Sequence, residues 1–174
     1  NRHWFDRTVL ILTSNSSWLG EDRPCLTYST RGVIDLNVSV SGPAHNLHTG
    51  VDGGALYEPV SDLMAVLGTL YDSSGSGGGS GRVVVPGFYD DVKGLSAEDR
   101  ARLDEVPFAL EDYSLRTGVG RFKASDPASL LELRWRQPSV SVASLDTSNK
   151  ARLHSVIPFE ASAKLSVRFV PHQD

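Results

Sequence analysis

Two stretches of strict polar–apolar alternation constrain the fold of this chain more than any other feature. In residues 160–169 every second residue is apolar: Ala161, Ala163, Leu165, Val167 and Phe169. Residues 34–40 show the same pattern, with Ile34, Leu36, Val38 and Val40. A period of two places the apolar side chains on one face of a strand. Both stretches therefore predict strands of an antiparallel sheet that has one covered and one open face.

The apolar spacing between these strands is helical. A helix is predicted over about residues 56–71, with Pro59 acceptable only in its first turn. Shorter helices are expected over 96–105 after a Ser96 cap, over 108–116 before Gly118, and over 126–135 after Asp126. Further short strands are expected at 83–85 and 139–142. The predicted class is α+β: a ferredoxin-like antiparallel sheet with helices covering one face.

The first thirty residues have a different character. Residues 9–12 form a short apolar run, typical of a strand buried on both faces in a parallel sheet, yet no parallel partner lies nearby. We therefore expect residues 1–30 to be a terminal strand and connector from a larger domain, and residues 31–174 to be a separate domain. The chain starts with Asn1, so we expect a fragment or a processed product. Residues 73–81 (Ser-Ser-Gly-Ser-Gly-Gly-Gly-Ser-Gly) are either a natural low-complexity insertion or a linker that replaces a loop.

Composition excludes several classes of function. The 174 residues, 40% of them hydrophobic and 22% charged, indicate an ordinary globular chain. The net charge of −4 disfavours nucleic acid or an anionic membrane as the main partner. No apolar run approaches the ~20 residues of a membrane helix. The single cysteine, Cys25, cannot form an internal disulfide, so a reducing, cytoplasmic location is expected.

Few residues are candidates for chemistry. None of the five histidines has a helical i,i+4 partner, and adjacent acids lie mostly on predicted polar helix faces, so we expect no complete metal site in this chain. Cys25 matches no catalytic cysteine motif and is interpreted as a packed thiol. His48 stands in a glycine-rich loop, residues 46–54, ahead of a predicted helix. It is either a functional histidine on a firm loop or a turn histidine with a local hydrogen bond.

A series of motifs in this order resembles the carnosinase-like zinc metallopeptidases of the aminoacylase clan. The motifs are residues 24–28 (Pro-Cys-Leu-Thr-Tyr), 31–32 (Arg-Gly), 47–54 (Leu-His-Thr-Gly-Val-Asp-Gly-Gly), 58–59 (Glu-Pro), 62–63 (Asp-Leu), 85–91 (Val-Pro-Gly-Phe-Tyr-Asp-Asp), 134–139 (Arg-Trp-Arg-Gln-Pro-Ser), 155–158 (Ser-Val-Ile-Pro) and 166–171 (Ser-Val-Arg-Phe-Val-Pro). The resemblance covers about residue 9 to the end. It corresponds to the family's lid, or dimerisation, domain, preceded by one strand of the catalytic domain.

The resemblance implies roles for three residues. His48 matches the lid histidine that reaches into the partner subunit's active site and stabilises the tetrahedral intermediate. Ser155 falls where the family usually has a substrate-contacting Thr. Arg168 matches the lid arginine that binds the substrate carboxylate. In that family the catalytic domain, not the lid, supplies the zinc ions and a Glu general base, and a homodimer is implied.

One position departs from the family pattern. Asn15 stands where the family has a metal-ligating Asp, and a neutral amide is a poorer zinc ligand than a carboxylate. Asn15 and the residues around Cys25 are most similar to the peptidase-like subunit of the fungal glutathione-degrading complex, which acts beside a glutamine-amidotransferase-like subunit. The expected function is thus the lid of a dipeptidase-like homologue in glutathione (γ-glutamyl peptide) degradation. The alternatives are the lid of an ordinary active zinc dipeptidase (Cys-Gly or Xaa-Gly type) and a purely structural dimerisation scaffold.

Overall fold

The computed structural model describes residues 5–11, 19, 27–72 and 81–173. The chain divides into two compact units, Asn1–Thr30 and Arg31–Asp174. In the first unit, Val9, Leu10 and Ile11 form no strand and are 65–100% exposed, so the prediction of a buried strand is wrong for these three residues. A strand needs a hydrogen-bonding partner, and none of the described residues provides one. Leu12, Asn15 and Cys25 lie outside the described residues.

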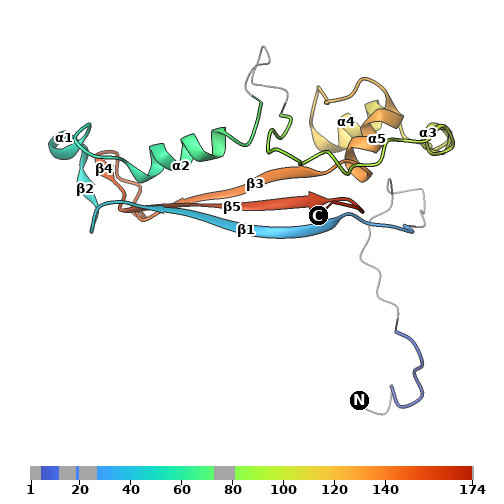
Figure 1. Cartoon of the computed structure of the whole chain (residues 1–174), viewed down its shortest axis with the longest axis horizontal. Coiled ribbons are helices and arrows are strands. Elements are labelled where there is room, and N and C mark those ends of the chain that lie inside the picture. The colour runs from blue at the N-terminus through green and yellow to red at the C-terminus, as the bar shows by residue number, and fades with distance from the viewer. Residues whose placement is uncertain (1–4, 12–18, 20–26, 73–80, 174) are drawn as a thin grey trace. The chain divides into compact units, whose positions relative to one another are not determined.

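The described residues of the second unit form five strands and five helices (Figure 1). In chain order they are β1 (Gly32–Ser41), β2 (Leu47–His48), α1 (Thr49–Asp52), α2 (Pro59–Gly68), α3 (Ala97–Asp104), α4 (Leu110–Thr117), α5 (Pro127–Trp135), β3 (Ser139–Thr147), β4 (Val156–Ile157) and β5 (Glu160–Phe169). None of the described helices has the length and apolar character needed to cross a bilayer.

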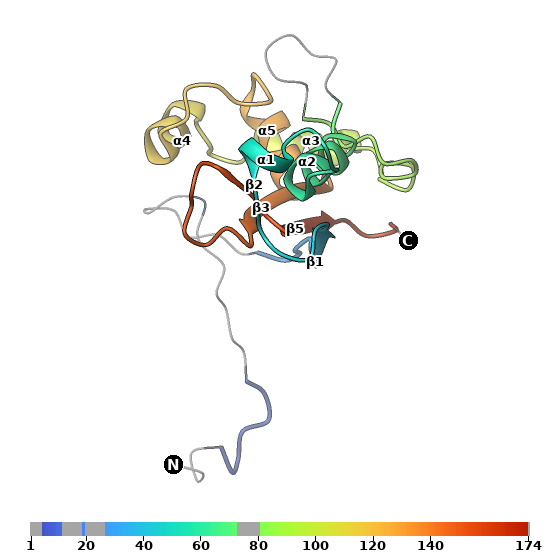
Figure 2. The same ribbon diagram turned by 90° about the vertical axis from the view of Figure 1, so that its left-hand side faces the viewer.

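The main sheet is antiparallel, with the order β1-β5-β3. The last strand of the chain therefore lies in the centre. Its register places Leu165 opposite Leu36 on one side and Val142 on the other, so apolar residues share one face across all three strands. Residues of the other parity, such as Lys164 and Ser166, share the opposite face with polar partners. The helices lie on one side of this sheet (Figure 2), and the predicted fold class is confirmed.

Helix α2 covers the apolar face of the sheet. Leu63 and Leu67 of α2 are buried against Ala161, Ala163 and Leu165 of β5. Since Leu63 and Leu67 are four residues apart, they lie on one side of the helix. The opposite side of α2 is open, and Met64 is 58% exposed. The helix is shorter than the sequence predicts because Pro59 occupies its first turn, so that Leu56 precedes it, and it ends at Gly68.

The remaining elements follow their local signals. Ser96 and Asp126 cap α3 and α5 by accepting hydrogen bonds from the backbone N–H groups of Asp99 and Ser129. Gly118 ends α4 in the left-handed conformation, with φ 69°. The strand expected at 83–85 is reduced to an isolated bridge between Tyr71 and Val83. The glycine-rich loop, in contrast, contains the short strand β2, which pairs with β4 in a second small sheet, and the single-turn helix α1; neither the small sheet nor α1 was predicted.

Candidate functional site

His48 lies in the small sheet, opposite Val156, and directly precedes α1. Its Nδ1 accepts a hydrogen bond of 3.1 Å from the backbone N–H of Gly50. In a neutral imidazole, a ring nitrogen that accepts leaves the proton on the other nitrogen. Nε2 is therefore the donor of the neutral ring, and the side chain is exposed. His48 thus makes the local hydrogen bond expected of a turn histidine. The same hydrogen bond leaves the Nε2–H group of the exposed ring as a donor.

Ser155 lies beside His48. The carbonyl of Ser155 accepts a hydrogen bond of 3.1 Å from the backbone N–H of Thr49, the residue after His48, and the Ser155 side chain is exposed. Exposed apolar side chains occur on the neighbouring segments: Val51 is 79% exposed, Tyr57 87% and Leu153 61%. This end of the sheet, residues 47–57 with 153–157, is called the histidine tip below. It combines hydrogen-bond donors with an uncovered apolar surface.

Arg168 lies near the far end of β5. Its register partners are Val33 on β1 and Ser139 on β3, and its parity places it on the open, polar face of the sheet. The side chain is exposed, and no carboxylate among the described residues lies within 4 Å of it. An exposed guanidinium without an internal carboxylate is available to an external anion.

The structure brings His48 and Ser155 together and keeps Arg168 apart from both. The backbone N–H of Gly42 binds the carbonyl of Phe159, so the histidine tip adjoins the start of β5, while Arg168 is eight residues past Glu160. At about 3.4 Å per residue in a strand, this separation is roughly 27 Å. Figure 1 shows β2, β4 and α1 at one end of the long strands and the C-terminal end of β5 at the other.

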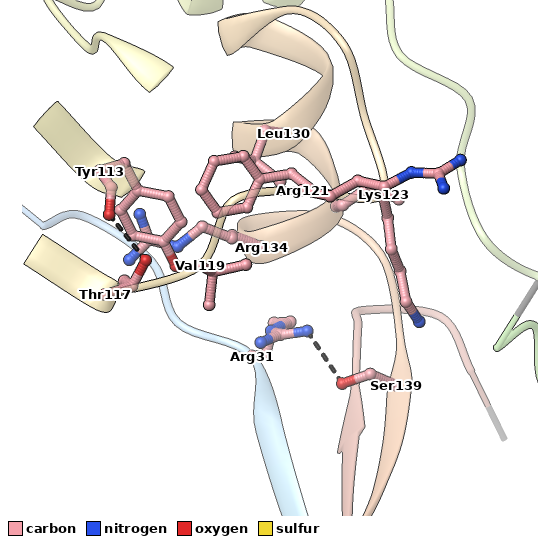
Figure 3. Close-up of a pocket in the computed structure, with 11 residues that line it drawn as sticks. Arg31, Tyr113, Thr117, Val119, Arg121, Lys123, Leu130, Arg134 and Ser139 are labelled. Atoms are coloured by element: carbon pink, nitrogen blue, oxygen red, sulfur yellow. Dashed lines mark hydrogen bonds between the residues drawn. The ribbon is translucent and has the colours of Figure 1, made fainter. Parts of the chain in front are cut away.

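A shallow cavity of ≈ 380 Å³ lies close to the Arg168 end (Figure 3). Four basic side chains line it: Arg31, Arg121, Lys123 and Arg134. Burial lowers the pKa of Arg31, and the nearby positive charges of Arg168 and Arg134 lower it further. No sequence pattern indicates that these four residues form a cluster. Its members are up to 103 positions apart, and only the pairing of β1, β5 and β3 brings Arg31 to α5.

The described residues hold no group of three or more His, Cys, Asp or Glu side chains that could bind a metal ion. The part of the chain that the structure describes thus does not supply the ligand set of a zinc enzyme.

The class of protein follows from the comparison of folds. The chain superposes on human carnosine dipeptidase 1 with a TM-score of 0.82 and 34% identity, covering 92% of this chain and 33% of that structure. It superposes on an M20 family metallo-carboxypeptidase from Sulfolobus solfataricus with a TM-score of 0.72 and 25% identity, covering 83% and 32%. The fold is that of the dimerisation domain of M20 metallopeptidases.

The sequence comparison gives the particular relatives. The chain is 32% identical over 172 residues to the Cys-Gly metallodipeptidase of Schizosaccharomyces pombe and 34% identical over 171 residues to the Beta-Ala-His dipeptidase of Rattus norvegicus. Each match covers 98% of this chain but only 34–35% of the relative. The probable di- and tripeptidase DUG2 of Saccharomyces cerevisiae is 28% identical over 163 residues, 17% of its length. No protein-family model matches. The chain is thus a homologue of carnosinase-like metallodipeptidases and spans about a third of their length, which confirms the resemblance.

Proposed function

We propose that this chain is the lid and dimerisation domain of a dipeptidase-like metallopeptidase, in which His48, Ser155 and Arg168 contact the substrate. The observation that carries the proposal is the placement of exposed donors in the small sheet β2-β4 and at the far end of β5 in the main sheet, within a chain homologous to metallodipeptidases. The metal ions, zinc in our proposal, and the general base would come from the rest of the enzyme. There the metal would polarise the scissile carbonyl.

Each of the three side chains has chemistry suited to a bound peptide. The Nε2–H of His48 donates a hydrogen bond, which is what a developing oxyanion requires. The hydroxyl of Ser155 can donate to the same substrate from the neighbouring strand. The guanidinium of Arg168 can bind a terminal carboxylate through two parallel hydrogen bonds. No step requires any of these residues to act as a nucleophile.

The distance between the two ends supports an active site shared between subunits. A dipeptide is only about 7 Å long, whereas the part of β5 that lies between the histidine tip and Arg168 of one chain spans roughly 27 Å. The two residues of one chain therefore cannot contact the same dipeptide. If both serve one substrate, they come from different copies of the chain, and a homodimer is required. The exposed apolar residues of the histidine tip give it a surface suited to insertion into a partner subunit.

Mixed dimers of the full-length parent protein test this proposal. We expect His48→Ala and Arg168→Ala each to lose at least about 100-fold in kcat/KM, as loss of an oxyanion donor does. After the two variants are mixed and allowed to exchange subunits, half of the dimers are mixed and each has one intact site, so about a quarter of wild-type activity should return. His45→Ala, three residues before His48, is the matched control and should keep full activity both alone and in mixed dimers.

Two results would contradict the proposal. If mixing restores no activity although mass spectrometry shows mixed dimers, the two residues do not serve one site from different chains. If His48→Ala retains full activity while the dimer persists, the domain is a structural scaffold only.

Within this function, we propose degradation of glutathione or another γ-glutamyl peptide in the cytoplasm, beside a glutamine-amidotransferase-like subunit. The support is Asn15 and its sequence context. The second candidate is an ordinary Cys-Gly or Xaa-Gly zinc dipeptidase. It is favoured by relatives that are Cys-Gly and Beta-Ala-His dipeptidases at 32–34% identity. The variant Asn15→Asp in the full-length protein distinguishes the two candidates. A rise in bound zinc, measured by elemental analysis, shows that Asn15 is the cause of weak zinc binding and favours the first candidate. Unchanged zinc content and activity favour the ordinary dipeptidase.

A further inference from the structure

The cavity lined by Arg31, Arg121, Lys123 and Arg134 carries an excess of positive charge. No Asp or Glu lines it. The chain as a whole has a net charge of −4, so this cluster of positive charges has the opposite sign to the net charge of the chain. Clefts that are lined by one sign of charge concentrate ligands of the opposite sign.

Some other arginines of the same domain do have carboxylate partners. Arg136, two residues after Arg134, forms an ion pair of 3.0 Å with Asp99, and Arg100 forms one of 2.9 Å with Asp126. Within the described ranges, none of the four cavity cations has a carboxylate within 4 Å. The cations of the cavity are therefore not neutralised by the part of the domain that the structure describes.

The inner two cations are fixed in position. Arg31 donates through Nη1 to the carbonyl of Gln137 at 2.8 Å and to the hydroxyl of Ser139 at 3.3 Å. Arg134 lies over the ring of Tyr113, 4.9 Å from the centroid. Its Nη1 is buried and has no hydrogen-bond partner among the described residues. Aromatic faces compensate only part of the hydration that a guanidinium loses. An anion in the cavity would compensate for the remaining loss of hydration of the Arg134 guanidinium.

Figure 3 shows how these groups surround the opening. Arg134 extends from α5 toward Tyr113, and Arg31 points toward Ser139 from the end of β1. Since the Ser139 hydroxyl oxygen accepts from Arg31, its own proton can be donated to a ligand. Lys123 binds the carbonyl of Gly81 at 3.3 Å and, like Arg121, is exposed at the rim. The cavity volume of ≈ 380 Å³ falls at the small end of ligand sites.

We propose that this cavity binds a small anion with two or more negative charges, held by Arg31 and Arg134 with Arg121 and Lys123 at the rim. Arg168, for which a substrate role is proposed above, is the register partner of the lining residue Ser139 but does not itself line the cavity. The shared chemistry is that of a pyrophosphate-type group or of a peptide with two carboxylates. A binding measurement without turnover tests it, so that its outcome is independent of the peptidase proposal.

Isothermal titration of the 174-residue chain with pyrophosphate and with the dipeptide Glu-Glu provides the test. Binding of one or both supports the site and identifies the source of the anion. Arg31→Gln should weaken binding about tenfold or more, since a hydrogen bond to a charged group is worth roughly 1.5–3 kcal/mol. The double variant Arg121→Gln/Lys123→Gln, whose side chains are exposed, should weaken it similarly and leaves the packed residues untouched.

Arg102→Gln on α3 is the matched control. It removes the same charge from an exposed site outside the cavity and should leave affinity unchanged. Circular dichroism verifies that each variant is folded, and the rim double variant decides the outcome if Arg31→Gln does not fold. The proposal is overturned if neither anion binds. It is also overturned if Arg102→Gln weakens binding at least half as much, in free energy, as the rim double variant, which removes two charges, because the effect then comes from net charge alone.

Discussion

Asp126 combines two interactions at the start of α5. Its Oδ1 accepts a 2.9 Å hydrogen bond from the backbone N–H of Ser129 and pairs with Arg100, also at 2.9 Å. The hydrogen bond from Ser129, with a further contribution from Arg100, lowers the pKa of Asp126 below its ordinary value of 3.8. A carboxyl group whose pKa is lowered by folding stabilises the folded state at every pH above its ordinary pKa. This stabilisation is lost as the pH falls from the ordinary pKa through the lowered pKa of the folded state.

We therefore expect Asp126→Ala to lower the melting temperature at pH 7 and to lower it by progressively less as the pH falls below 3.8 toward the lowered pKa of the folded state. Thermal unfolding followed by circular dichroism between pH 3 and pH 7 measures this. Asp112→Ala is the control because Asp112 is an exposed acid in the first turn of α4 and does not cap that helix. An Asp126→Ala deficit that stays constant across the pH range would show that the charge of Asp126 contributes nothing.

The ends of the helices depend on single residues, and Gly118 at the end of α4 can be tested directly. Its φ of 69° is strained for any residue with a Cβ, although a Cβ at Gly118 would meet no atom within 4 Å. We expect Gly118→Ala to reduce the free energy of unfolding by about 1 kcal/mol. Gly94→Ala is the matched control, since a Cβ there also meets no atom within 4 Å and its φ is not in the left-handed region. Equal effects in urea unfolding would refute the conformational explanation.

At this scale, local chemistry explains which elements were predictable. Ser96, Asp126 and Gly118 act on residues within four positions of themselves, so the boundaries of α3, α4 and α5 could be predicted to within two residues. The period of two likewise identified β1 and β5. Strands β2 and β4 are two residues long and carry no period, so they could not be found. The strand prediction for residues 9–11 was wrong for another reason, because an apolar run forms a strand only where a partner strand exists.

The basic cavity illustrates what depends on the whole fold. Arg31 and Arg134 lie in motifs that the resemblance identified, yet nothing in either motif indicates that they share a cavity. Their proximity depends on the antiparallel register, in which Ser139 and Arg168 are paired across β3 and β5 and Arg31 reaches Ser139. The same register separates Arg168 from His48. Sequence resemblance could assign a role to His48 and to Arg168. Only the register shows how far apart they lie in one chain, and this distance favours an active site shared between two subunits.

The outer edge of β1 is where we expect two copies of the chain to meet. Within the described residues, β1 pairs with β5 along one edge, and Val33, Ile34 and Leu36 are 46–49% exposed. A ten-residue edge strand with exposed apolar side chains is a template for a second strand. Met64 and Val66 of α2 are exposed as well. A dimer of this kind would join two sheets across a two-fold axis.

We expect the double variant Ile34→Lys/Leu36→Lys to raise the dimer dissociation constant of the parent protein about 30-fold or more, as loss of interface hot spots does. Sedimentation velocity over a range of concentrations measures it, and circular dichroism verifies the fold. Val84→Lys is the control because Val84 is 48% exposed and lies outside the edge strand. If the lysine variant becomes monomeric and loses activity together with dimerisation, the edge strand and the shared site are linked, since a monomer cannot bring His48 and Arg168 to one substrate. If the Ile34→Lys/Leu36→Lys variant remains dimeric, the dimer interface does not include the edge of β1.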